Sequence, residues 1–61
     1  MQDIVLRETR NGELMLSAVV DGVEKRALVT RKSADYLGIL QIGGIHLSES
    51  ELISYAIAYL L

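Results

Sequence analysis

Several residue types are missing from this 61-residue chain, and each absence narrows the kinds of site that it can build. There is no cysteine, which excludes disulfide bonds, thiolate metal sites and thiol redox catalysis. Proline, tryptophan and phenylalanine are also absent. A chain this small buries only about 60% of its unfolded surface, and small domains commonly add association with another chain to a thin core. We expect a single domain over residues 1–61.

Long runs of basic or apolar residues are lacking as well. The net charge is −2, and the basic residues are scattered between Arg7 and Lys32, which disfavours binding to nucleic acid. The apolar stretch at the C-terminal end has about ten residues, far fewer than the ~20 that a membrane-spanning helix needs. The segment 1–3 has neither the basic nor the apolar part of a signal peptide. We expect a cytoplasmic protein with no membrane contact.

Hydrophobic residues, by contrast, reach 51%, and they dominate the end of the chain. Ser48 and Glu51 have the S-x-x-E spacing of a capping box, which predicts a helix over about 48–61. After Glu51 only Ser54 interrupts the apolar residues, whereas a surface helix normally keeps a polar face. This surplus of apolar side chains favours a partner, most simply a second copy of the chain.

Two tight-turn dipeptides, Asn11-Gly12 and Asp21-Gly22, divide the first half of the chain. Both tolerate the positive φ angles of a type I′ turn, which closes a two-residue hairpin. The pattern predicts an antiparallel meander of three strands, at about 3–10, 13–20 and 23–30.

Two-residue loops would fix the register of the meander. Arg10 would then lie opposite Glu13, and Val5 opposite Ala18. One face would be largely apolar and form the core, with Val5, Leu14, Leu16, Ala18, Val20, Val23, Ala27 and Val29. The other face would mix apolar and polar residues, namely Ile4, Leu6, Met15, Val19 and Leu28 with Glu8, Ser17, Glu24 and Arg26. A slip of one residue would exchange the faces.

A short helix over about 31–37 is expected between the sheet and the final helix. Thr30 or Ser33 would cap its start, and Gly38 would end it in the left-handed conformation. Residues 39–42 are expected as a short strand or a buried connector, followed by a break at residues 43–44. The predicted fold is therefore α+β: a three-stranded antiparallel meander, a short helix or turn, and a C-terminal helix packed on the sheet.

Two segments are similar to known patterns. Residues 17–34 show an apolar strand, an Asp-Gly turn, a second strand and a helix start, and they resemble small uncharacterised bacterial proteins of the YrdB type. That resemblance implies a β-hairpin followed by a helix and transfers no site residue. Residues 33–39 resemble the first helix and turn of a helix-turn-helix, but no basic recognition helix follows them.

The function that we expect is that of a small non-catalytic protein-interaction module that forms a homodimer, as an accessory protein of a bacterium or phage. The final helix is predicted to place Ile53, Ile57 and Leu60 on its own sheet. Its tyrosines offer large area with a hydroxyl that can find a polar partner, which suits an interface. The predicted interface residues are Leu52, Tyr55, Ala56, Tyr59 and Leu61.

Two other functions stay open. The first is a small DNA-binding or transcription-modulating protein that uses Arg26, Arg31 and Lys32. The second is a subunit or inhibitor that docks on a different protein through an exposed strand or the terminal helix. An enzyme is not expected, because His46 is the only histidine and no nucleophile, acid–base pair or phosphate loop stands out. We therefore expect no catalytic residue, cofactor or metal.

Overall fold

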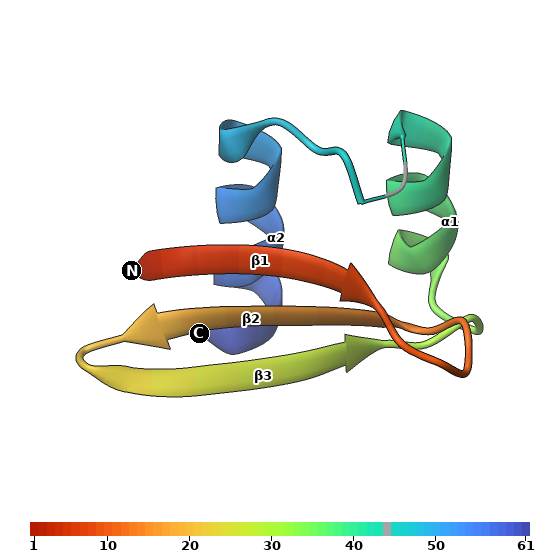
Figure 1. Cartoon of the computed structure of the whole chain (residues 1–61). Helices are drawn as coiled ribbons and strands as arrows, with labels where there is room; N and C mark the ends of the chain where they lie inside the picture. Colours follow the sequence, from red (N-terminus) through yellow and green to blue (C-terminus); the bar gives the residue numbers. More distant parts are fainter. Residues whose placement is uncertain (44) are drawn as a thin grey trace.

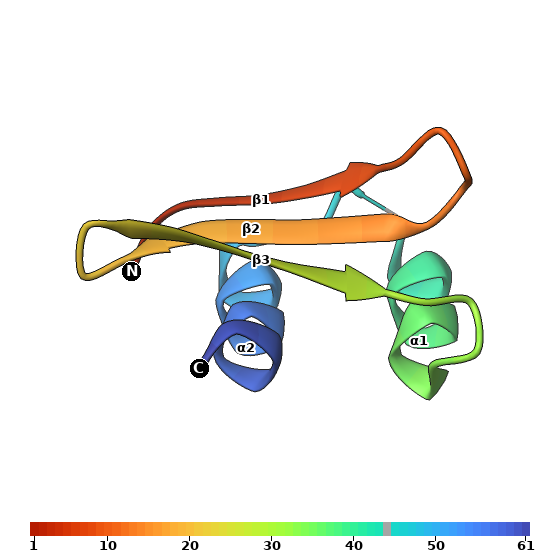
Figure 2. The same ribbon diagram turned by 90° about the horizontal axis from the view of Figure 1, so that it is seen from below.

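The computed structural model of the chain describes residues 1–43 and 45–61, and it confirms the α+β fold. Three strands, β1 (Gln2–Glu8), β2 (Leu14–Val20) and β3 (Val23–Val29), form an antiparallel sheet in the order β1-β2-β3. Two helices follow, α1 (Ala34–Ile42) and α2 (Glu49–Leu60). Both helices lie on the same side of the sheet, and no described element covers the other side (Figure 1 and Figure 2).

The second hairpin has the predicted two-residue turn. Asp21 and Gly22 both have positive φ, 52° and 79°, as a type I′ turn requires. The pairing then continues without a shift from Val20 opposite Val23 to Leu14 opposite Val29. The predicted register between the second and third strands is confirmed.

The first hairpin differs from the prediction by one residue. The Gly12 N–H donates to the Thr9 carbonyl at 3.0 Å, and the Thr9 N–H donates to the Glu13 carbonyl at 2.7 Å. The loop is therefore three residues long, with Gly12 at φ 74°, and Thr9 rather than Arg10 lies opposite Glu13. The extra loop residue moves β1 by one position along β2.

This shift exchanges the two faces of β1, as a one-residue slip must. Leu6 pairs with Leu16 and is buried, and Ile4 packs against the core. Val5 pairs with Ser17 and lies on the open face instead. The predicted placement of Val5 in the core, and of Ile4 and Leu6 outside it, is wrong.

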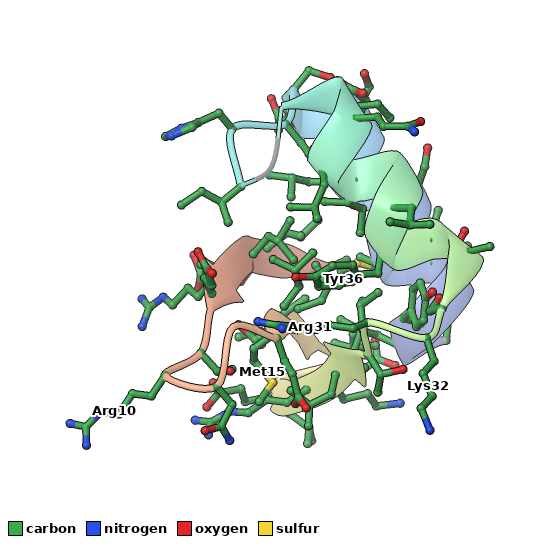
Figure 3. All side chains as sticks on the ribbon, turned by 90° about the vertical axis from the view of Figure 1, so that its right-hand side faces the viewer. Arg10, Met15, Arg31, Lys32 and Tyr36 are labelled. Atoms are coloured by element: carbon green, nitrogen blue, oxygen red, sulfur yellow. The ribbon has the colours of Figure 1, made fainter. Side chains whose placement is uncertain are left out.

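Contacts from the end of the sheet and from α1 hold the three-residue loop. The Arg31 guanidinium donates to the carbonyls of Asn11 and Gly12 at 3.3 and 3.4 Å. The Tyr36 hydroxyl donates to the Gly12 carbonyl at 2.9 Å, so this oxygen accepts from two side chains (Figure 3). These donors lie 19 to 24 positions along the chain from the loop, which is why the dipeptide alone did not predict the loop length.

The first helix is longer than predicted. Ser33 caps it by accepting from the Asp35 N–H at 3.1 Å, one of the two predicted caps. Gly38 lies inside the helix rather than at its end, and Gly43, at φ 137°, ends it. Residues 39–42, predicted as a strand or connector, form its second half. Burial of Ile39, which is fully enclosed, outweighs the cost of about 1 kcal/mol for an internal glycine. Gly44 lies outside the described residues.

The start of the last helix follows the prediction closely. The Glu51 N–H donates to the Ser48 Oγ at 3.3 Å, and the Ser48 N–H donates to Glu51 Oε1 at 3.2 Å. This reciprocal pair is the capping box, which satisfies two amides that the helix leaves free. Leu47 and Leu52 on either side of it both pack against the core.

The core lies between the sheet and the two helices. Its buried members are apolar apart from one tyrosine hydroxyl: Leu6, Leu14, Leu16, Ala18, Val29, Tyr36, Ile39, Ala56 and Leu60. Within residues 1–43 and 45–61, no buried side-chain nitrogen or oxygen lacks a hydrogen-bond partner. The described core is thus built by apolar packing, and it offers no unpaired polar side-chain atom to a ligand.

Candidate interaction surface

The inner side of α2 carries most of the residues that were predicted to meet a partner. Ala56 is fully buried, and the side chains of Leu52, Tyr55 and Tyr59 pack against the core. Of the predicted interface, only Leu61 is strongly exposed, at 69%. Ala56 is therefore enclosed by its own chain, whereas Leu52, Tyr55 and Tyr59 are half-buried against their own core, and their contact with a partner stays a prediction.

The outer flank of α2 carries the residues that were predicted to dock on the sheet. Leu60 does dock, but Ile53 and Ile57 are 38% and 53% exposed. The predicted division of the helix is thus reversed for these two isoleucines. The physical reason is that α1 extends alongside α2 and offers polar partners to the tyrosine flank, so the opposite flank faces outward.

A three-residue cluster ties the tyrosine flank to the start of α1. The Tyr59 hydroxyl donates to the Asp35 carboxylate at 2.5 Å and lies 3.2 Å from the Ser33 hydroxyl. Burial raises the pKa of Tyr59 above its ordinary value of 10.0, and the hydrogen bond to Asp35 raises this pKa further, while Ser33 opposes the rise. The cluster joins the two helices, and its hydrogen bonds engage the Tyr59 hydroxyl within the chain.

The outer flank of α2 faces the end of the sheet that carries the β2–β3 turn. A groove beside it is lined by the first residues of β1 together with Leu52 and Ile53. On β3, Val23 is 60% exposed, and it lies on the same side of the sheet as the helices because it pairs with Val20. We call Val23, Ile53, Ile57 and Leu61 the turn-side apolar surface. The groove beside it also carries Asp3 and Glu49, and Lys25 lies next to Val23 on the helix side of β3.

The strand β3 borders this surface and is the most exposed strand of the sheet. Its residues from Val23 to Arg26 are all exposed, and only Val29 is buried. Glu24 and Arg26 point to the open face, where their side chains form a salt bridge of 3.1 Å with more than half of each exposed. The outer edge of β3 is bordered by no other strand of the described chain.

The strand β1 forms the other edge, and its pairing is interrupted. Asp3 has φ 53°, and the register shifts between Gln2 and Val5. Asp3 and Ile4 together lie opposite the single residue Ala18, which is the arrangement of a β-bulge. A bulge bends an edge strand and hinders further strand pairing.

The basic residues proposed for DNA contact are not brought into one patch. Arg26 pairs with Glu24 in the middle of β3, and Arg31 binds the carbonyls of the β1–β2 loop. Lys32 is exposed and points away from Arg31, as does Arg10 (Figure 3). A phosphate backbone would therefore meet isolated charges rather than a continuous basic strip.

The polar residues singled out for chemistry are exposed or already engaged. His46 is exposed in the connection between the helices, and Ser48 is occupied as the helix cap. Among residues 1–43 and 45–61, no three His, Asp or Glu side chains gather closely enough to hold a metal ion. None of the helices in this described part is long and apolar enough to cross a membrane.

Comparison with known proteins adds no assignment. A scan against protein-family models finds no match, and searches of curated proteins and of solved structures find none either. The resemblance of residues 17–34 to YrdB-type proteins therefore stays a prediction.

Proposed function

We propose that the chain is a small, non-catalytic protein-interaction module that associates with a second copy of itself. The observation that carries this proposal is the number of large apolar side chains left exposed around a thin core. Among the described residues they are Met1, Val23, Leu28, Leu37, Leu40, Ile42, Ile45, Ile53, Ile57 and Leu61. An exposed apolar area that is clustered rather than scattered marks a surface for association.

The turn-side apolar surface is the best supported place for this contact. It gathers exposed apolar side chains of α2 and β3, and Lys25 is the charged residue that lies next to Val23 on the same side of β3. Two copies that meet there bury mainly apolar area. Full burial of a Val, Leu or Ile side chain is worth roughly 1.5–3 kcal/mol. Because these side chains are only partly exposed, each recovers part of that energy, and several together are needed to offset the cost of association.

Analytical ultracentrifugation of the unmodified chain at micromolar concentration tests the proposal. We expect a mass of two chains, and a shift toward one chain for Ile57→Lys, because the lysine would have to be buried in the contact. Ala58→Lys is the matched control, since Ala58 is exposed on α2 but lies outside the turn-side apolar surface. A stable single-chain mass for the unmodified protein at this concentration contradicts self-association.

Tyr55→Glu is not a suitable variant for that test. Tyr55 packs against the core, and its hydroxyl lies close to Gly38 of α1. Because Tyr55 is half-buried, a glutamate there would lower the free energy of unfolding of the single chain and so obscure any separation of two copies.

The alternative functions have weaker support. A DNA-binding role lacks a basic patch, and retention on DNA at low salt is the measurement that would revive it. Docking on a different protein would use the same exposed strand and helix flank. A single-chain mass together with specific capture of one partner would favour that reading over self-association.

A further inference from the structure

The outer edge of β3 has a regular row of free backbone groups. The two residues that flank a two-residue type I′ turn, here Val20 and Val23, form a hydrogen-bonded pair. Since such pairs alternate along an antiparallel ladder, the peptide groups of Val23, Lys25 and Ala27 face β2. Those of Glu24, Arg26 and Leu28 consequently point away from the sheet. The pairing with β2 has no shift along β3, so no bulge interrupts this edge.

Two of the residues whose peptide groups point away from the sheet, Glu24 and Arg26, carry side chains of opposite charge. Glu24 and Arg26 lie on either side of Lys25, with 55% and 64% of their side chains exposed. We propose that β3 pairs antiparallel with β3 of a second copy about a two-fold axis at Lys25, which makes one continuous six-stranded sheet. Glu24 of each copy then lies opposite Arg26 of the other. This inference rests on the proposed self-association and specifies its geometry.

Charge selects this register over its neighbours. Only the residues with outward-pointing peptide groups, Glu24, Arg26 and Leu28, can form hydrogen-bonded pairs with the second copy. The next possible register on either side therefore shifts one strand by two residues along the other. The next register in one direction places Glu24 opposite Glu24 of the second copy, and the next in the other direction places Arg26 opposite Arg26. Like charges directly opposite in a ladder are destabilising, and opposite charges are favourable. The register at Lys25 has two opposite-charge pairs and one like-charge pair, Lys25 with Lys25, whereas each neighbouring register has one like-charge pair and no opposite-charge pair. The register at Lys25 is therefore preferred over both.

The two lysines at the axis lie on the helix side of the sheet, because Lys25 pairs with Ala18 of the core face. Figure 1 shows α2 crossing the strands so that its C-terminal end lies over β2 and β3. The last turn of α2 has no basic residue of its own, and a helix C-terminus attracts positive charge. The ends of two α2 helices can thus offset the repulsion between the two lysines.

The same rotation brings the turn-side apolar surfaces together. The β2–β3 turn projects beyond α2 (Figure 1). Ile53 lines the groove beside the first residues of β1, which lie at the same end of the sheet as this turn, and Ile57 and Leu61 follow Ile53 at intervals of four residues on the same side of α2. In the two-fold pair the second α2 arrives from this direction, so the two flanks approach each other. Val23 meanwhile lies opposite Ala27 of the second copy. Strand pairing and apolar burial thus occur in a single contact.

Cross-linking through a single cysteine tests the axis directly, because the chain has no other cysteine. In Lys25→Cys the two thiols form a non-hydrogen-bonded cross-strand pair, with Cβ atoms about 4.5–5.5 Å apart and within reach of a disulfide after a small adjustment. We expect a disulfide-linked dimer on mild oxidation that reducing agent reverses. Val23→Cys, also at an exposed position of β3 but opposite Ala27, is the control and should cross-link far less. Equal cross-linking at both positions, or none at Lys25, overturns this geometry.

Charge reversal separates a failure of the geometry from a failure of self-association. Glu24→Arg and Arg26→Glu each place like charges opposite in both symmetric pairs, so we expect the dissociation constant to rise about two- to thirtyfold. The double variant restores opposite charges and should return to within about twofold of the unmodified chain. If the chain dimerises and neither single variant changes the dissociation constant, pairing through β3 is overturned, while the proposed self-association stands. A single-chain mass for the unmodified protein overturns the proposed function as well.

Discussion

The strands β1 and β3 occupy corresponding edges of the same small sheet, yet they are held in different ways. The bulge at Asp3 bends β1, and Ile4 and Leu6 anchor this strand in the core. In contrast, β3 has no bulge and is exposed along most of its length, with Val29 as its one buried residue. A sheet edge with free peptide groups invites pairing, and proteins commonly blunt edges that must stay single. This chain blunts one edge and leaves the other open, which is the asymmetry expected of a protein that pairs through one strand.

The largest difference between the edges should appear on truncating a leucine in each. Leu6 in β1 is 7% exposed, so Leu6→Ala should lower the free energy of unfolding by about 2–5 kcal/mol. Leu28 in β3 is 47% exposed on the open face, and Leu28→Ala should change it by no more than about 0.5 kcal/mol. Urea denaturation at equal protein concentration measures both. A large cost at Leu28 would show that something covers the open face.

The two turn glycines distinguish the hairpins next to these edges. Gly12 and Gly22 have φ of 74° and 79°, so alanine at either position should cost about 1–2 kcal/mol through backbone strain. A Cβ on Gly12 would also lie 2.0 Å from the Arg31 guanidinium, while a Cβ on Gly22 meets no described atom within 4 Å. We expect Gly12→Ala to cost up to about 1 kcal/mol more, because Arg31 must release the loop carbonyls.

Thermal unfolding of a double-variant set checks the cause of that excess. In an Arg31→Ala background the two alanine variants should become equal in cost. If Gly12→Ala stays the more damaging of the two without Arg31, the excess comes from the loop backbone itself.

Two tyrosine hydroxyls give a smaller contrast. Tyr36 donates to the loop after β1 from a partly buried position, so Tyr36→Phe should cost about 1 kcal/mol. Tyr59 donates to Asp35 at an exposed position, and Tyr59→Phe should cost less because water can replace its partner. Chemical denaturation of both variants compares the two anchors. A greater loss for Tyr59 would mean that the helix pair, rather than the first hairpin, holds the fold together.

The weakest effect is a dependence of stability on alkaline pH. Because the pKa of Tyr59 is raised in the folded chain, the unfolded chain loses this proton first as the pH rises. The stabilisation is fully present below about pH 10, and it is lost between the unfolded-state pKa of 10.0 and the higher folded-state pKa. Denaturation curves at pH 9 to 11 should show a steeper decline for the unmodified chain than for Tyr59→Phe. Parallel declines would argue against this cause.

Much of the fold could be predicted from the amino-acid sequence, because the motifs that specify its turns and helix ends involve residues close together in the sequence. The Asp21-Gly22 turn and the Ser48–Glu51 capping box each involve residues within a few positions, and both form as predicted. The apolar alternation along 14–20 placed the core face of β2 correctly. The outward flank of α2 was harder to predict, because an all-apolar helix does not reveal which of its flanks faces outward.

What the sequence determined by itself is therefore the list of elements, the second hairpin and the excess of apolar surface over core. The tertiary structure decided the register of β1 and the orientation of α2. In both cases the deciding hydrogen bonds join residues 19 to 26 positions apart: Arg31 and Tyr36 to the first loop, and Tyr59 to Ser33 and Asp35. Such contacts select between local structures of nearly equal energy, and they exist only once the chain is folded.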